Sequence, residues 1–246
     1  MDAPRLLAEL TWPEIAEIVA TGQGLCLLPV GATEQHGRHL AVGTDTIIAD
    51  AICREASSRT GVPLLPTLAI TSSQAHTTKW PGTLALPPRL LVETVLEIAR
   101  WVRASGFDRL LFVNAHVGNA APLTVAIDEL RQIDELRVGL LHWYDATPEI
   151  GAFATADAID WHAHRAETAL MLHLRPDLVR TEEIRDDADR TDGLVFSYTV
   201  AETSREGLTG SPSLATAADG ARLFERVVEA LEQRIEAARR EEPPTL

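Results

Sequence analysis

Short apolar runs alternate with longer amphipathic segments along most of this chain. Four runs have the length of a strand and are apolar on both faces: 24–30, 62–70, 109–114 and 137–143. Such runs are typical of buried parallel strands. Three segments between them carry apolar residues at helical spacing: 45–58, 88–104 and 120–133. Strands and helices in regular alternation predict a three-layer α/β/α sandwich with a mainly parallel central sheet.

The pattern also predicts helices towards both ends of the chain. Thr11 and Glu14 form a capping box around Pro13, which indicates the start of a first helix. A last helix is indicated by a stripe of apolar residues: Ala218, Ala221, Phe224, Val228, Leu231 and Ile235. Because no internal repeat or low-complexity run interrupts the sequence, we expect residues 1–246 to form a single domain.

Charge and composition narrow the class of partner. The chain has 36 acidic and 22 basic residues, a formal charge of -14, so its surface repels phosphate backbones and anionic lipids. No apolar run approaches the roughly 18 residues that cross a bilayer, and acidic residues near the N-terminus disfavour a signal peptide. We therefore expect a cytoplasmic protein that binds neither nucleic acid nor membranes. Cys26 and Cys53 lie within apolar patterns, so no disulfide is expected.

Polar residues gather after the carboxyl ends of two predicted strands, which is where open parallel sheets bind their ligands. Val30 is followed by GATEQHGRHLAVGTD and Asn114 by AHVGN. Neither segment contains GxxxxGK[ST] or GxGxxG, so the two standard phosphate-binding loops are absent and nucleotide chemistry is disfavoured. The chain also lacks a GxSxG motif, and Cys26 lies within a strand, so a serine or cysteine nucleophile is not supported.

The first of these segments has the composition of a metal site. Glu34 and His36 are two residues apart, so in extended backbone their side chains leave on the same side. Asp45 follows at the start of the next predicted helix. Two carboxylates and an imidazole suit zinc, manganese or iron. Taken singly, Asp45 also fits a helix-dipole partner, Glu34 a solvated loop charge and His36 a buried structural histidine; together they favour a metal site.

Two further clusters carry candidate ligands. His116 lies in the run NAHVGN, at the carboxyl end of the predicted strand RLLFVN, among small residues that allow close backbone approach. The alternative is a loop histidine bonded to carbonyl groups. In DWHAHRAETALMLHL, His162, His164 and Glu167 precede an apolar helical pattern. His164 and Glu167 share a helix face through their three-residue spacing, whereas His162 precedes the regular turns. These patterns alone do not rank the two histidines.

Five motifs of the sequence resemble those of a known protein family. PVGATEQHGRHLAVGTD resembles the signature of the creatininase (creatinine amidohydrolase) family. NAHVGN, HAHRAET, KWPGTLAL and GLTGSPSLATAADG resemble motifs of the same family. The resemblance covers about residues 24–232, which would be the core of the domain. It implies a three-layer α/β/α fold, a two-metal centre that hydrolyses cyclic or linear amides, and assembly into a homo-oligomer, often a hexamer.

The resemblance also implies a role for each candidate residue. It implies two divalent ions per chain, zinc, manganese or iron, with a bridging Asp45 among the ligands: Glu34, His36, Asp45, His116 and Glu167. His162 resembles the histidine that handles the proton, and with Glu167 it makes the expected catalytic pair. Residues expected to contact substrate are His76, Trp80, Val117, Trp161 and His164.

Three departures from the family pattern bear on the substrate. NAHVGN stands where NGHGGN is common, so Ala115 and Val117 narrow a loop that glycines normally leave open. Gly118 replaces a glutamate of creatininases proper, so creatinine is not the expected substrate. His164 stands where glycine is usual. We expect a small polar amide or formamide, with a peptide, lactone or C–C bond hydrolase, or a non-catalytic metal- or small-molecule-binding relative, as the alternatives.

Overall fold

The computed structural model describes residues 3–21, 24–76, 79–132 and 135–244. Its strands are β1 (Leu25–Val30), β2 (Arg109–Asn114) and β3 (Arg137–His142). Its α-helices are α1 (Trp12–Ala20), α2 (Thr44–Thr60), α3 (Pro88–Ala104), α4 (Ala120–Leu130), α5 (Pro148–Ala154), α6 (Arg165–Leu174), α7 (Val200–Thr203) and α8 (Ala217–Arg240). Two 3-10 turns lie near the candidate site, at Gln74–His76 and Val117–Asn119.

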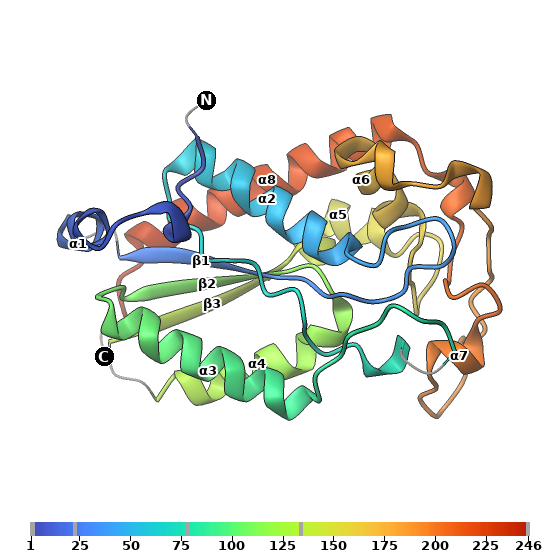
Figure 1. The fold of residues 1–246 in the computed structure, drawn as a ribbon, viewed down its shortest axis with the longest axis horizontal. Helices are drawn as coiled ribbons and strands as arrows, with labels where there is room; N and C mark the ends of the chain where they lie inside the picture. Colours follow the sequence, from blue (N-terminus) through green and yellow to red (C-terminus); the bar gives the residue numbers. More distant parts are fainter. Residues whose placement is uncertain (1–2, 22–23, 77–78, 133–134, 245–246) are drawn as a thin grey trace.

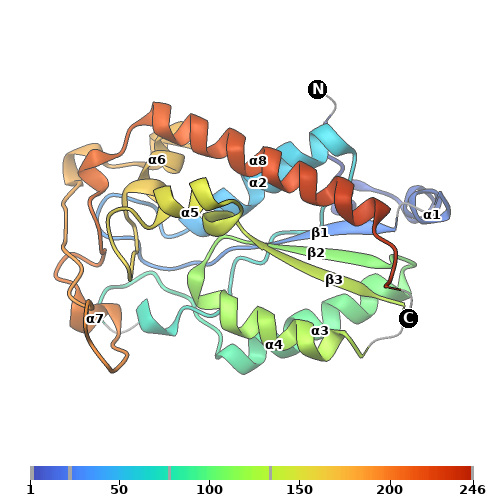
Figure 2. The same cartoon turned by 180° about the vertical axis from the view of Figure 1, so that it is seen from behind.

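The strands form a parallel sheet in the order β1-β2-β3 with helices on both of its faces (Figures 1 and 2). One core packs α2, α5, α6 and α8 against strand residues such as Leu27 and Leu111. The other packs α3 and α4 against the alternate residues, such as Leu28 and Phe112. β1 and β2 are buried on both faces, and β3 is partly buried at the edge of the sheet. The predicted three-layer α/β/α fold is confirmed.

The segment 62–70 is not the fourth strand that its apolar pattern predicts. It runs beside β1 through isolated bridges at Leu64 and Leu68 only. Leu27 donates its N–H to the carbonyl oxygen of Pro63 and accepts a hydrogen bond from the N–H of Leu65. The next residue of β1 on this edge is Pro29, which offers a carbonyl and no N–H. Pro66 likewise has no N–H to donate. A strand prediction from hydrophobicity alone was wrong here because prolines interrupt the ladder.

The predicted helices form close to their expected bounds. α3 matches 88–104, α2 extends 45–58 at both ends, and the Thr11–Glu14 capping box begins α1. α4 ends at Leu130, before residue 133, which lies outside the described residues. In α8 the predicted stripe is buried at Val228, Leu231 and Ile235, whereas near the start of the helix Gly220 is buried and Ala218 is exposed. α5, which begins after the N-cap Thr147, was not predicted.

Close packing of α6 against α8 places the ligand-bearing end of α6. Gly220 of α8 lies so near α6 that an added Cβ would be 1.8 Å from the carbonyl oxygen of Ala169. Only glycine allows that approach. Cys26 and Cys53 are buried free thiols, as expected. Among the described residues, no helix combines the length and hydropathy needed to cross a membrane.

Candidate metal centre

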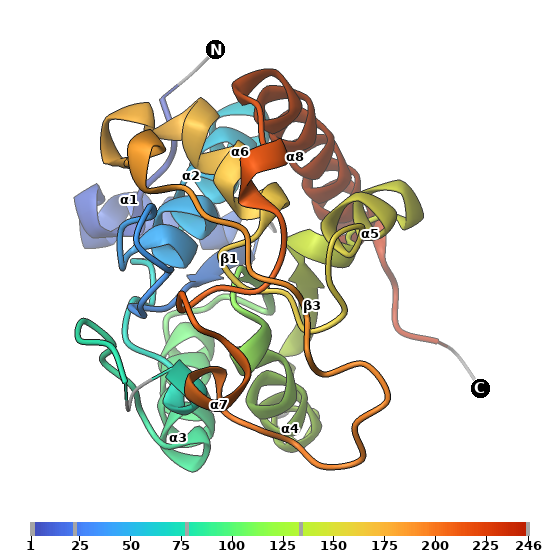
Figure 3. The same cartoon turned by 90° about the vertical axis from the view of Figure 1, so that its right-hand side faces the viewer.

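The candidate ligands converge beyond the carboxyl ends of β1 and β2, at the end of the molecule that faces the viewer in Figure 3. Glu34 and His36 lie in the segment after β1, and Asp45 lies in the first turn of α2. His116 follows β2, and Glu167 lies in the first turn of α6. All five side chains are buried. The structure thus brings together every residue that was predicted as a metal ligand.

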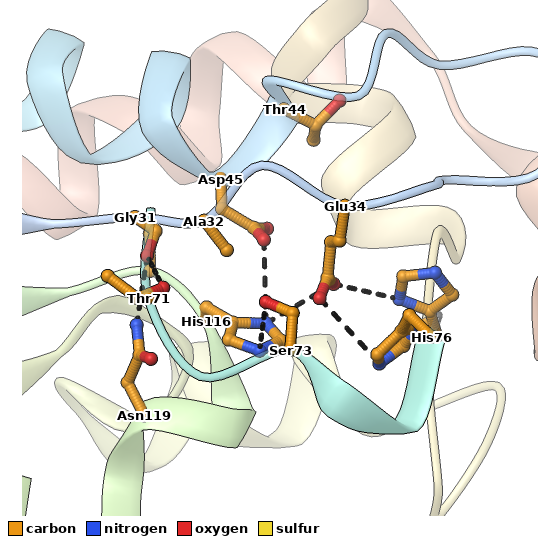
Figure 4. A network of polar contacts seen from close by, with 12 residues as sticks. Gly31, Ala32, Glu34, Thr44, Asp45, Thr71, Ser73, His76, His116 and Asn119 are labelled. Carbon is orange, nitrogen blue, oxygen red and sulfur yellow. Dashed lines mark hydrogen bonds and ion pairs between the residues drawn. The ribbon is translucent and has the colours of Figure 1, made fainter. Parts of the chain in front are cut away.

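Asp45 lies between two groups of ligands. Its Oδ1 is 3.3 Å from Nε2 of His36, and its Oδ2 is 3.4 Å from Nδ1 of His116. The group around His116 also contains Glu34, whose Oε1 lies 3.2 Å from Nδ1 of His116 (Figure 4). The group around His36 also contains Glu167, whose Oε1 lies 3.8 Å from Nε2 of His36. Each group brings three ligand atoms close enough to share one ion, and Asp45 belongs to both.

Several atoms of this cluster are buried without a hydrogen-bond partner: both carboxylate oxygens of Glu34, both of Asp45, and Nε2 of His36. Buried polar atoms left unpaired cost about 1–3 kcal/mol each, and more when charged. Divalent cations would satisfy all of them. Carboxylate oxygens and imidazole nitrogens are ligands of zinc, manganese and iron. The residues present therefore fit a pair of divalent ions.

Without cations, the cluster is held by opposing charges. Burial lowers the pKa of His116, but the Glu34 and Asp45 carboxylates outweigh burial and raise this pKa to about 9. Burial, together with the neighbouring Glu34, raises the pKa of Asp45 to about 6. For His36, the Asp45 and Glu167 carboxylates outweigh burial and hold the pKa well above its ordinary value. Cations entering the centre would replace the protons on these rings.

The backbone around the centre orients two of the candidate ligands, His36 and His116. Nδ1 of His36 donates to the carbonyl oxygen of Glu34 (3.1 Å), which leaves Nε2 for the centre. Nε2 of His116 donates to the carbonyl oxygen of Ser72 (3.0 Å), which leaves Nδ1. Such bonds fix the tautomer of a metal-binding histidine. Gly31 lets β1 approach α2, because an added Cβ would lie 2.4 Å from Cα of Thr46, next to Asp45.

His162 lies beside the ligands. Its Nε2 donates to the carbonyl oxygen of Gln35 (2.7 Å), and its Nδ1 faces Oε1 of Glu34 at 3.5 Å. Burial, reinforced by the His76 and His36 rings, holds the pKa of His162 well below its ordinary value, so the ring is neutral at pH 7. Ala163 follows with a left-handed φ of 49°, which is strained for a residue with a side chain.

A cavity of about 180 Å³ opens onto the centre, lined in part by Glu34, His116, His162 and Glu167. Its remaining walls are Ala75, His76, Val117, Gly118, Asp160, Trp161, Tyr198 and Val200. Three residues predicted to contact substrate, His76, Val117 and Trp161, therefore line this cavity. Asp160, Tyr198 and Val200 were missed, because they come from irregular segments and from α7, without a recognisable motif.

Two residues predicted to contact substrate do not line this cavity. Trp80 packs close to Gly207 and beneath the Lys79 ammonium, which lies 4.4 Å from its ring. His164 is fully buried behind Glu167, with Nδ1 3.2 Å from Oε2 of that carboxylate. The left-handed backbone at Ala163 separates the directions of His162 and His164. His164 therefore contacts a ligand carboxylate and not the cavity.

Gly118 stands where the family resemblance leads one to expect a glutamate in creatininases proper. An added Cβ there would lie 2.4 Å from Nε2 of His116 and 2.6 Å from the carbonyl oxygen of Ser72. The hydrogen bond that orients His116 occupies this space. In this chain a side chain at position 118 would displace His116, so the packing around this candidate ligand requires glycine there.

Sequence relatives share this architecture along almost the whole chain. Residues 8–235 match the family profile "Creatininase: Creatinine amidohydrolase". The chain is 31% identical to the creatinine amidohydrolase of Pseudomonas putida, covering 97% of this chain and 98% of the relative. It is 32% identical to the mycofactocin precursor peptide peptidase of Mycolicibacterium smegmatis, covering 86% of this chain and 84% of the relative.

Solved structures agree with the sequence relatives. The manganese form of creatininase superposes with a TM-score of 0.83 at 29% identity, covering 97% of this chain and all of that one. A mutant creatininase described as the Zn-Zn type superposes with a TM-score of 0.82 at 30% identity, covering 96% and 98%. The chain therefore belongs to the creatininase family and is a hydrolase of carbon–nitrogen amide bonds.

Proposed function

We propose that this chain cleaves a carbon–nitrogen bond of a small polar amide or formamide, cyclic or linear, with two divalent ions of zinc, manganese or iron. Glu34, Asp45 and His116 would hold one ion. His36 and Glu167 would hold the other together with the second oxygen of Asp45. The observation that carries this proposal is the position of Asp45, which turns one carboxylate oxygen to each group of ligands.

The chain's own residues would hold the reacting groups and move the proton. Bound at such a centre, two cations supply a water-derived nucleophile at neutral pH and polarise the carbonyl oxygen. His162 is neutral, with its proton held on Nε2 by the Gln35 carbonyl, so Nδ1 is available as an acceptor on the cavity side. It would take up a proton there and deliver it to the departing nitrogen, a role typically worth about 10²- to 10⁴-fold in rate.

The size of the cavity favours a small substrate. Its volume of about 180 Å³ is below the roughly 300–1,000 Å³ of sites that hold drug-sized ligands. With the amide at the ligands, the rest of the molecule would meet His76, Trp161 and Tyr198. Creatinine is disfavoured, because Gly118 supplies no carboxylate to its ring, and an unpaired buried donor costs roughly 1–3 kcal/mol.

A peptide is the second candidate substrate. Curated relatives at 32–34% identity act as mycofactocin precursor peptide peptidases. Val117 is 46% exposed at the cavity edge, where a longer chain could contact it.

We also propose, from the family resemblance, a cytoplasmic homo-oligomer, often a hexamer in this family. Its native mass in solution would test the assembly.

Metal analysis followed by a substrate panel tests the proposed function. Purified protein should carry close to two divalent ions per chain, lose turnover when a chelator removes them, and recover turnover when they are returned. The panel should contain small amides, formamides and lactams, a matched lactone series, short peptides and creatinine. A metal-free preparation with full activity would refute the proposal. Two bound ions without turnover of any C–N substrate would favour a lactone or C–C bond hydrolase, or a non-catalytic binding protein.

A further inference from the structure

A second imidazole lies directly behind Glu167. His164 is the N-cap residue of α6, and its side chain is fully buried. Its Nδ1 is 3.2 Å from Oε2 of Glu167, and its Nε2 is 2.8 Å from the carbonyl oxygen of Ala154. Both neighbours are acceptors. Among the described residues, no group that could hold a metal includes His164. A ring that carries a proton on each nitrogen donates to both oxygens, and Nδ1–H is the donor to Glu167.

The two oxygens of Glu167 therefore have different surroundings. Oε1 faces Nε2 of His36, in the group of ligands that includes Asp45. Oε2 is taken by His164. A glutamate at the third position of a helix commonly folds back onto the backbone N–H of the N-cap residue. Here the N-cap side chain meets the carboxylate, which stays turned towards the centre.

Trp161 and Gly210 pack closely against His164. The His164 ring stacks on Trp161 with ring centroids 4.4 Å apart and an angle of 30°. An added Cβ at Gly210 would lie 2.7 Å from Cβ of His164, and the φ of Gly210 is +132°. Gly210 thus provides the space for His164. A ring fixed in this way can hold a carboxylate oxygen in one place.

We propose that His164 is a positioning residue, which holds Oε2 of Glu167 so that only Oε1 is presented to the ion shared with His36 and Asp45. The inference rests on the proposed two-metal function. It concerns a residue that differs from the glycine usual in the resembling motif. Loss of a partner of this kind typically weakens metal binding about 10- to 100-fold.

Two substitutions separate the hydrogen bond to Glu167 from the rest of the ring. The amide nitrogen of asparagine can occupy the position of Nδ1, whereas that of glutamine can occupy the position of Nε2. His164→Asn can therefore keep the contact to Glu167, and His164→Gln only the contact to Ala154. His173→Gln is the matched control, because His173 lies on the same helix and packs on Phe224. Metal-stripped proteins are titrated with Zn²⁺ against a chromophoric chelator, and unfolding of the metal-free proteins checks the fold.

We expect the parent protein to bind two Zn²⁺ ions. In His164→Gln one of the two steps should weaken about 10- to 100-fold while the other changes less than about twofold. His164→Asn and His173→Gln should stay close to the parent. The inference is overturned if His164→Gln binds both ions like the parent, or if His164→Asn weakens as much as His164→Gln. A parent that does not bind two ions refutes the proposed function itself, which distinguishes the two failures.

Discussion

The histidines of the centre divide their two ring nitrogens in the same way. One nitrogen donates to a backbone carbonyl: that of Glu34 for His36, Ser72 for His116 and Gln35 for His162. The other nitrogen faces buried carboxylates. A backbone acceptor fixes the tautomer without placing another charge in the centre. The chemistry of each ring therefore depends on a carbonyl that no motif displays.

Asp45 is the residue whose loss should be most damaging. Asp45→Asn leaves one oxygen and an NH₂ group that cannot ligate, so the two groups of ligands lose their shared member. Glu34→Gln keeps one amide oxygen and leaves Asp45 in place between His36 and His116. We expect kcat/KM to fall at least about 100-fold in Asp45→Asn, since metal-ion catalysis is worth several kcal/mol, and less in Glu34→Gln. Metal content by mass spectrometry should fall in both. Unchanged metal and turnover in Asp45→Asn would make Asp45 a helix-terminal carboxylate only.

His162→Asn separates proton transfer from metal binding. His162 lies beside Glu34, and its loss should leave the ions in place. We expect two bound ions, an unchanged circular dichroism spectrum and a kcat lower by about 10²- to 10⁴-fold. The result to compare is metal content against kcat on one amide. A large loss of metal would instead identify His162 as a ligand.

The pH dependence of stability should contain a contribution from His39. Burial lowers the pKa of His39 to about 4, against about 6.5 in an unfolded chain. The unfolded chain therefore binds this proton first, and stability is lost as pH falls from about 6.5 towards 4. His39→Gln can keep the contact that Nε2 makes with Oγ1 of Thr168 (2.9 Å) and removes the titration. Urea unfolding of the metal-free proteins at pH 6.5, 5.5 and 4.5 should show a shallower decline in the variant; parallel declines would contradict this assignment.

At the scale of elements, short segments after regular structure carry the ligands. The loop after β1, the turn after β2 and the first turns of α2 and α6 contribute one or two ligands each. The carboxyl ends of parallel strands meet at one edge of the sheet, which brings these segments together. The helices then fix the distances, so helix packing far from the centre should affect it.

Gly220→Ala tests this dependence. A methyl group at position 220 would collide with the carbonyl oxygen of Ala169 in α6. We expect the free energy of unfolding to fall by about 1–3 kcal/mol, as for other overpacked sites, and metal affinity to fall with it. Gly151→Ala in α5 is the matched control, because its nearest atoms are 3.8–4.0 Å away. It should be stabilising by about 0.5–1 kcal/mol, from helix propensity. Equal effects of the two substitutions on unfolding would argue against tight packing at Gly220.

At the scale of the whole molecule, the ions should be a large part of stability. Three buried carboxylates, Glu34, Asp45 and Glu167, lie together in a chain with a net charge of -14. An ion at 100 times its Kd adds about 2.7 kcal/mol of unfolding free energy. In a chain of this size that corresponds to roughly 5–11 °C in Tm per ion. Calorimetry with and without chelator should show this loss, reversed by excess metal. A Tm that is the same with and without chelator would mean that the centre binds no ion.

Much of this architecture follows from the order of residues alone. Alternating apolar runs and amphipathic segments determined the parallel sheet, most of the helices and the site at its carboxyl edge, because both depend on local periodicity. Motif resemblance indicated five candidate ligands, including Asp45, and the structure buries all five close together. From the residue types alone, Glu34, His36 and Asp45 together favoured a metal site. The full set of five and the shared position of Asp45 were implied by the resemblance.

Tertiary structure decided what depends on neighbours distant in the chain. The run 62–70 has a strand's hydrophobicity, yet Pro29 on the adjoining edge of β1 interrupts its ladder. His162 and His164 are two residues apart in the sequence. The left-handed backbone at Ala163 directs His162 to the cavity wall and His164 to the far side of Glu167. Tyr198 joins the cavity wall from an irregular segment. Hydrogen bonds and close contacts act over a few ångströms in space, and spacing along a sequence does not encode which residues will share them.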